Sequence, residues 1–120
     1  MNQRQVEIQG KCIAFAVKID ALRKKLNKKH HEYNKADQVD RSASAIGALY
    51  SEAVCAESEA DYIHKLGIAQ KEANETIYWL KVINRCGYIE NEEYQSLITD
   101  VEELIRIITA IIVSLKRKNA

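Results

Sequence analysis

Proline is absent from all 120 residues of this chain, and only four glycines interrupt it. Because proline ends helices and shapes turns, a chain without it favours long helices joined by few, short connections. The apolar residues agree with this, since they recur at alternating steps of three and four residues, which is the period of one helix face. No segment of convincing length alternates apolar and polar residues as a half-buried strand does.

Four segments carry the helical spacing. They run over about residues 11–35, 38–56, 59–86 and 92–117. Four amphipathic helices with short connections form an antiparallel bundle. We therefore predict an all-α chain, an antiparallel up-down four-helix bundle over residues 11–118, preceded by a flexible N-terminal segment over residues 1–10.

The predicted helix ends have recognisable capping residues. Asp37 is the expected N-cap of the second helix and Asn91 that of the fourth. Ser58 and Asp61 form a variant of the capping box at the start of the third helix. Gly87 suits the left-handed residue that closes this helix.

Charge is segregated along the chain although its net value is only +1. Residues 1–35 hold nine Lys or Arg and three acidic residues, whereas residues 36–115 hold six and fourteen. A row of lysines on the first helix could meet successive phosphates of a nucleic acid. The alternative is a solvated face with no partner, and no aromatic residues lie among these lysines. The predicted nucleic-acid-binding residues are Arg23, Lys24, Lys25, Lys28, Lys29 and Lys35, with Lys116, Arg117 and Lys118 at the C-terminus.

The third and fourth helices carry apolar residues beside their main seams. Such a surplus marks a protein interface more often than a wide core, although some of these residues belong to the core. Two interpretations of Trp79, an interface anchor and a core residue, are equally well supported. The predicted contacts of a homo-oligomer are Ile68, Trp79, Val82, Ile105 and Ile112.

Small residues are concentrated in "RSASAIGALYSEA", Arg41–Ala53. The run has no GxSxG turn that would expose a nucleophilic serine, and Gly47 stands alone, so it does not form a phosphate loop. Close approach of neighbouring helices is the favoured explanation. We expect no catalytic residues, and so no enzyme.

Metal, cofactor and membrane sites are also not expected. Glu72-x-x-Glu75 lacks the histidines of a di-iron bundle, so neither a metal nor a cofactor is predicted. The longest apolar stretch has twelve residues, which is too short to cross a bilayer. With three unpaired cysteines and no visible secretion signal, the expected compartment is the cytoplasm.

The run of small residues, followed by "AESEADYIHKLGIAQKEANETIYWL" and "GYI", resembles bacterial proteins of the 23S ribosomal RNA intervening-sequence family. The resemblance covers roughly residues 13–118. It implies a four-helix bundle that assembles into rings, typically pentamers, without enzymatic activity. A related branch, the accessory variability determinants of diversity-generating retroelements, implies binding of RNA or DNA and of a reverse transcriptase.

This chain departs from that pattern in two respects. The usual "SIGAN" reads Ala45-Ile46-Gly47-Ala48-Leu49, so a Ser and an Asn are replaced, and the chain is far less basic than the retroelement branch. Two functions therefore stay open. One is an oligomeric scaffold that binds nucleic acid through the first helix. The other is a protein-binding module that uses the acidic faces of the third and fourth helices.

Overall fold

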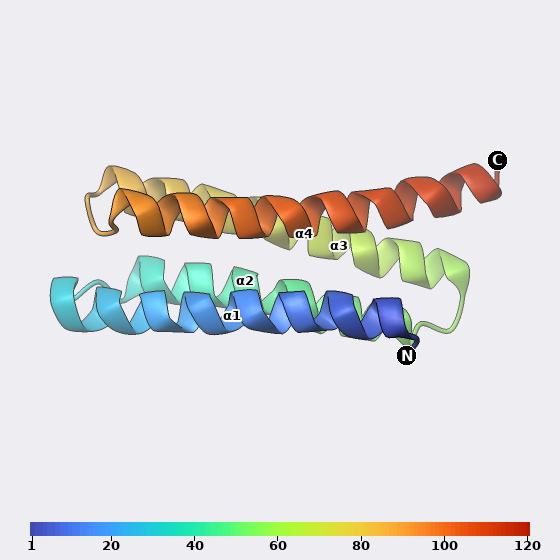
Figure 1. Cartoon of the computed structure of the whole chain (residues 1–120), viewed down its shortest axis with the longest axis horizontal. Helices are drawn as coiled ribbons and strands as arrows, with labels where there is room; N and C mark the ends of the chain where they lie inside the picture. Colours follow the sequence, from blue (N-terminus) through green and yellow to red (C-terminus); the bar gives the residue numbers. More distant parts are fainter.

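The computed structural model describes residues 1–120 and confirms the all-α four-helix bundle. The helices alternate in direction along a body of 49 × 22 × 22 Å (Figure 1). Both chain termini lie at one end of this body, together with the connection between the second and third helices. The helices are α1 (Gln3–His30), α2 (Asn34–Val54), α3 (Glu59–Arg85) and α4 (Asn91–Lys118).

Helix α1 begins eight residues earlier than predicted. Asn2 caps it, because its side chain accepts from the backbone N–H of Gln5 and the Gln5 side chain accepts from the backbone N–H of Asn2. Ile8 is buried in the core. The segment 1–10, predicted to be flexible, is therefore mostly the first two turns of α1.

Gly87 closes α3 as predicted, Ser58 forms only half of the predicted capping box, and the other two predicted caps are wrong. Ser58 accepts from the backbone N–H of Asp61, and Gly87 has a φ of 76° at the end of α3. Helix α2 begins before Asp37, and a carboxylate oxygen of Glu32 accepts from a first-turn N–H instead. Asn91 is the first residue within α4 rather than its cap, and Glu90 precedes it without a side-chain bond.

The core runs along the bundle and takes residues from every helix. Contacts join α1 to α2, α2 to α3, α3 to α4 and α4 to α1, whereas no Cα atoms of the diagonal helices α1 and α3 lie within 8 Å of each other. Most residues of the predicted seams are buried, but Tyr33 is 56% exposed, and Tyr62, Ile111 and Leu115 are only half-buried. The largest fully buried side chains are Tyr50, Ile8, Ile19, Leu22, Leu26, Ile46, Leu66, Leu80, Ile83, Leu104, Ile108 and Val39.

The run of small residues lies in α2, where it brings α2 close to both of its neighbours. A Cβ at Gly47 would lie 2.9 Å from the Cβ of Cys12, so only glycine fits against α1 there. On the other side, Ser42 is buried against α3, and its Oγ lies 2.8 Å from Oγ1 of Thr76. This serine is a packing residue rather than an exposed nucleophile.

Candidate nucleic-acid interface

Three lysines of α1 face α4 and are neutralised there. They are spaced seven residues apart, so they lie on one side of the helix. Their partners occupy the facing side of the antiparallel α4, and together they form a ladder of ion pairs along the seam between α1 and α4. The pairs are Lys11–Glu103 at 3.4 Å, Lys18–Asp100 at 2.7 Å and Lys25–Glu93 at 2.6 Å.

Besides Lys25, three of the predicted nucleic-acid-binding cations have acidic partners near the connection between α1 and α2. The guanidinium of Arg23 lies 3.4 Å from Asp37 and 3.8 Å from Asp40. The other two pairs are Lys24–Asp20 at 3.0 Å and Lys35–Glu32 at 3.2 Å. The hydrogen bond from the backbone N–H of Lys35 holds the pKa of Glu32 below its ordinary value. These cations mainly fix local structure.

Lys28 and Lys29 are exposed and form no ion pair. They lie in the last turn of α1, where cations also meet the negative end of the helix dipole. The next residue, His30, stacks on Tyr88 of the α3–α4 connection with ring centroids 4.7 Å apart. This stack fixes the end of α1 beside the connection. We call this end of the molecule, where α1 and α3 finish, the basic end.

The C-terminal cations do not belong to the basic end. Lys116, Arg117 and Lys118 lie in the last turn of α4, at the opposite end of the 49 Å body (Figure 1). Lys118 also pairs with Glu59 at 3.8 Å. The nine predicted nucleic-acid-binding residues therefore do not form one surface.

The five predicted interface residues are also divided. Ile112 is only 8% exposed and belongs to the core, so it offers little surface to another copy. Trp79 and Ile105 are half-buried against the core, and the indole N–H of Trp79 donates to Glu75 at 3.2 Å. Ile68 and Val82 are half-buried on α3. The core thus takes up part of the apolar surplus that the sequence shows.

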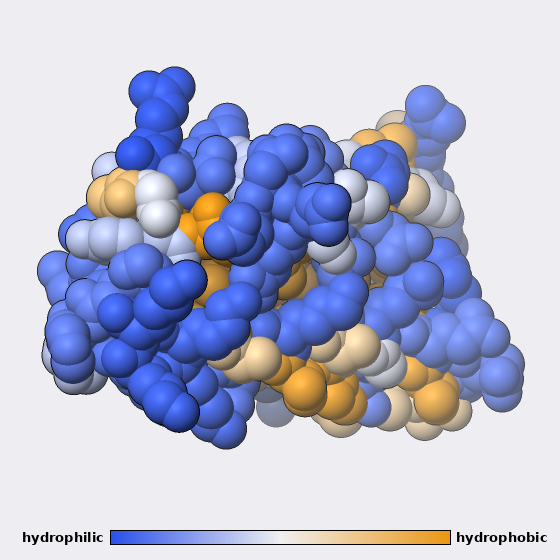
Figure 2. Space-filling view, turned by 60° about the vertical axis from the view of Figure 1, so that its left-hand side comes forward, coloured by the Kyte–Doolittle hydropathy of each residue, from blue (hydrophilic) through white to orange (hydrophobic).

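An exposed apolar row on α1 was missed. Val6, Ile13 and Val17 are 49%, 57% and 64% exposed. Their spacing of seven and four residues places them on one side of α1. That signal was visible in the sequence, but the row begins in the segment set aside as flexible. Figure 2 shows apolar side chains gathered along the lower edge of the molecule, the edge that α1 and α2 form in Figure 1.

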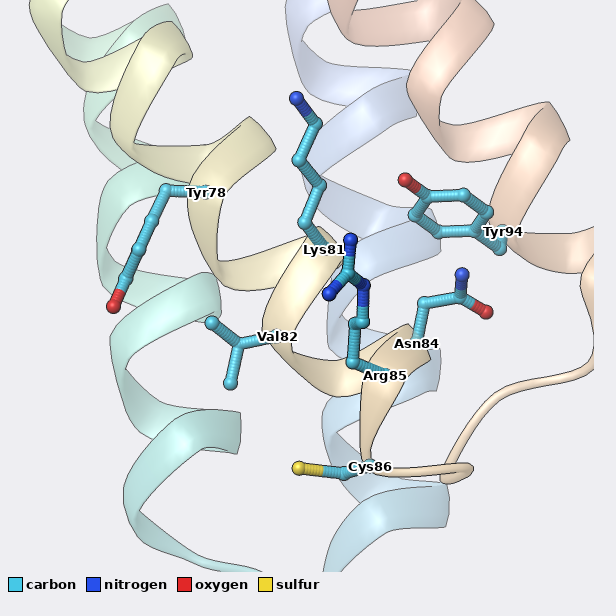
Figure 3. A pocket seen from close by; sticks show the side chains of 7 residues that line it. All are labelled: Tyr78, Lys81, Val82, Asn84, Arg85, Cys86 and Tyr94. Atoms are coloured by element: carbon cyan, nitrogen blue, oxygen red, sulfur yellow. The ribbon is translucent and has the colours of Figure 1, made fainter.

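A second missed feature is a hollow of about 700 Å³ beside the last turns of α3 (Figure 3). Lys81 and Arg85 lie on one side of α3 above it, and Tyr94 of α4 faces them. The sequence offered only a weak signal, because Tyr94 comes from another helix. The lining residues are Tyr78, Lys81, Val82, Asn84, Arg85, Cys86 and Tyr94.

Other kinds of site have little to build on. No three His, Cys, Asp or Glu side chains come together as metal ligands. None of the four helices has a stretch long and apolar enough to span a bilayer.

Comparison with known proteins gives the chain a family. The family model for the 23S rRNA-intervening sequence protein matches residues 4–110. A crystal structure of a protein of unknown function from the S23 ribosomal protein family of Bacteroides thetaiotaomicron is 43% identical, with a TM-score of 0.86 over 88% of this chain and 97% of that one. Comparison with curated proteins finds no match. The chain thus belongs to the 23S rRNA-intervening sequence protein family.

Proposed function

We propose that this protein is a non-enzymatic, homo-oligomeric scaffold of the cytoplasm that binds RNA or DNA at its basic end. The observation that carries the proposal is the pair of exposed lysines, Lys28 and Lys29, which have no acidic partner while every other lysine of α1 has one. Unpaired cations can contact phosphates without first breaking an internal ion pair. Such contacts release counterions and favour binding at low salt.

Oligomerisation would multiply this small charge. The row Val6, Ile13 and Val17 leaves apolar surface exposed along α1, and its seven- and four-residue spacing is that of helices which pack side by side. A second copy of the chain is the proposed occupant, as the family resemblance to ring-forming pentamers implies. A ring would repeat Lys28 and Lys29 in every subunit and strengthen the local field.

The family name supports RNA as the first ligand to test, because it refers to an intervening sequence of 23S ribosomal RNA. A reverse transcriptase, the partner suggested by the retroelement branch, would then be held through the nucleic acid or beside it.

The alternative, a protein-binding module that uses acidic faces of α3 and α4, has less support. Glu93, Asp100 and Glu103 of α4 already pair with lysines of α1. Glu72 and Glu75 of α3 both pair with Arg41 of α2. The acidic charge available to a partner is therefore much smaller than the sequence suggests.

The nucleic-acid part can be tested by charge reversal at the basic end. Binding of fluorescent single-stranded and duplex RNA would be measured by anisotropy over a salt series. The double variant Lys28→Glu/Lys29→Glu should bind at least tenfold more weakly and flatten the salt dependence by about two phosphate contacts per subunit. Lys71→Glu changes another exposed, unpaired lysine on α3 and should bind as the wild type does.

Two results would overturn the proposal. Equal affinity of wild type and double variant would remove Lys28 and Lys29 from binding, and a protein partner retained from nuclease-treated lysate would then favour the alternative. Sedimentation tests the assembly: a monomeric wild type, or an unchanged oligomer in Val17→Glu, would exclude the α1 row as the contact.

A further inference from the structure

We infer that the hollow beside the last turns of α3 binds one unpaired nucleotide, with its phosphate on Lys81 and Arg85 and its base against a tyrosine ring. The inference deepens the proposed function and rests on it for the source of the nucleotide. The hollow uses none of the residues of α1, so it can be tested separately.

Two cations above the hollow lack an internal partner. Lys81 and Arg85 are exposed, lie one helical turn apart and form no ion pair with any acidic residue. Like charges at this spacing destabilise a helix. A bound phosphate would relieve that repulsion, and the fork of N–H groups on Arg85 suits two phosphate oxygens at once.

Aromatic rings flank the two cations. Tyr78 is 58% exposed, and its hydroxyl forms no hydrogen bond within the chain. Tyr94 approaches from α4 with its ring toward the cations (Figure 3). Stacking of a base on an aromatic side chain is worth about 1–3 kcal/mol and tolerates any base. The hollow therefore pairs phosphate contacts with the stacking surface that the lysines of α1 lack.

The size of the hollow agrees with this ligand. Its volume of about 700 Å³ lies within the usual range of roughly 300–1,000 Å³ for small-molecule sites. It is open to solvent, so one nucleotide of a longer RNA can enter it. Val82 and Tyr78 supply apolar contact, and Asn84 supplies an amide that can donate to or accept from a base edge.

The chain contains its own reporter for occupancy. Cys86 lines the hollow and is exposed, whereas Cys55 is exposed at the opposite end of the bundle. Cys12 is buried, and burial raises its pKa to about 11, so it reacts slowly with alkylating reagents. Alkylation of Cys86 and Cys55 by iodoacetamide, followed in one sample by mass spectrometry, separates a local effect from a general one.

The experiment compares three ligands on the full-length protein. A six-nucleotide single-stranded RNA should slow alkylation of Cys86 at least threefold and leave Cys55 unchanged. Adenosine monophosphate is the second ligand: protection by it alone would show that a free nucleotide suffices, and protection by the strand alone would show that a chain supplies it. Equal protection by inorganic phosphate would overturn the role of the base.

Variants complete the test. Lys81→Glu/Arg85→Glu should abolish the protection of Cys86. Tyr78→Leu should raise the ligand concentration needed for half-maximal protection several-fold. If the ligand still protects Cys86 in the Lys28→Glu/Lys29→Glu variant, the hollow binds it without those two lysines. The inference about the hollow can then stand even where the proposal for Lys28 and Lys29 fails. No protection by either nucleotide ligand overturns the inference. So does a Cys86 that is inert without ligand in the oligomer, because another copy would then cover the hollow.

Discussion

Helices α2 and α4 both pack against α1, but by different means. Helix α2 meets α1 through Gly47, where a side chain would collide with Cys12. Helix α4 meets α1 through the ladder of lysines and carboxylates, several of which are more than a third exposed. The first contact fixes a distance between backbones, and the second mainly fixes register and charge.

The contact between α1 and α4 affects function because it uses lysines that could otherwise bind a nucleic acid. Exposed ion pairs add little to stability, because solvent and salt screen them. A lysine in such a pair must nevertheless break its ion pair before it can bind a phosphate. The charge segregation of the sequence is thus largely satisfied within one molecule, and the exposed cations that stay unpaired at the basic end are Lys28, Lys29, Lys81 and Arg85.

Removing the small residue from the α1–α2 contact should have the largest effect. Gly47→Ala places a Cβ 2.9 Å from Cys12, and overpacking of a core costs about 1–3 kcal/mol. The usual gain of roughly 1 kcal/mol for Ala over Gly in a helix offsets part of this cost. We expect a net loss of up to about 2 kcal/mol in the free energy of unfolding, measured by urea denaturation at fixed protein concentration.

Gly67→Ala is the matched control for that loss. Gly67 also lies inside a helix, but a Cβ there would have nothing within 4 Å. The change should therefore stabilise the protein by up to about 1 kcal/mol. If both alanine variants gain stability, the close approach of α1 and α2 at Gly47 is not a constraint.

The next effect concerns the buried contact between α2 and α3. Thr76 Oγ1 lies 2.8 Å from both Ser42 Oγ and the carbonyl oxygen of Glu72. Thr76→Val should cost about 1–2 kcal/mol, because Ser42 keeps only a bond of 3.3 Å to its own helix. Thr99→Val, at an exposed site, should change stability by less than about 0.5 kcal/mol.

A double variant sharpens this test. Ser42→Ala/Thr76→Val removes both hydroxyls and should cost less than the sum of the single changes, since no buried group is left without a partner. Strict additivity would mean that the two hydroxyls do not interact.

Tyr50 of α2 should give a smaller effect of opposite sign. Its ring is buried and its hydroxyl has no hydrogen-bond partner. Tyr50→Phe should therefore raise the free energy of unfolding by up to about 1 kcal/mol at pH 7. Burial raises the pKa of Tyr50 to about 12 from 10, so the wild type loses stability as the pH rises from 10 towards 12, and the advantage of the variant should grow there. A variant that is less stable than the wild type at pH 7 and also above pH 10 would contradict this account.

The sequence predicted the contacts of α2 better than those of α4. Small residues at helical spacing have one common use, so the run around Gly47 indicated close packing. Charged residues have several uses, and Lys25 was assigned to an external partner although it keeps a seven-residue spacing with Lys18 and Lys11. Only the fold shows that the facing side of α4 carries their acids.

The candidate functional sites also differ in how far the sequence could predict them. The seams of the helices were predictable because burial imposes a period, whereas the hollow at Lys81 and Arg85 depends on how α3 and α4 meet. The apolar row of α1 was missed for another reason: its first residue, Val6, lies in the segment that was expected to be flexible. A polar N-terminal segment can still be helical when Asn2 caps it and Ile8 joins the core.

The smallest effect should come from the ladder itself. In a double-mutant cycle with Lys18→Ala and Asp100→Ala, we expect a coupling energy of about 0.2–1 kcal/mol at low salt. The two side chains are 52% and 33% exposed although they lie 2.7 Å apart, so 1 M NaCl should reduce the coupling further. Lys71→Ala, which breaks no ion pair, serves as the control.

A coupling above 2 kcal/mol that resists salt would make the ladder a structural equal of the Gly47 contact and would end the contrast between α2 and α4. A weak coupling would instead let a competing phosphate displace Asp100 from Lys18, so RNA binding by the Asp100→Ala variant should rise, never fall.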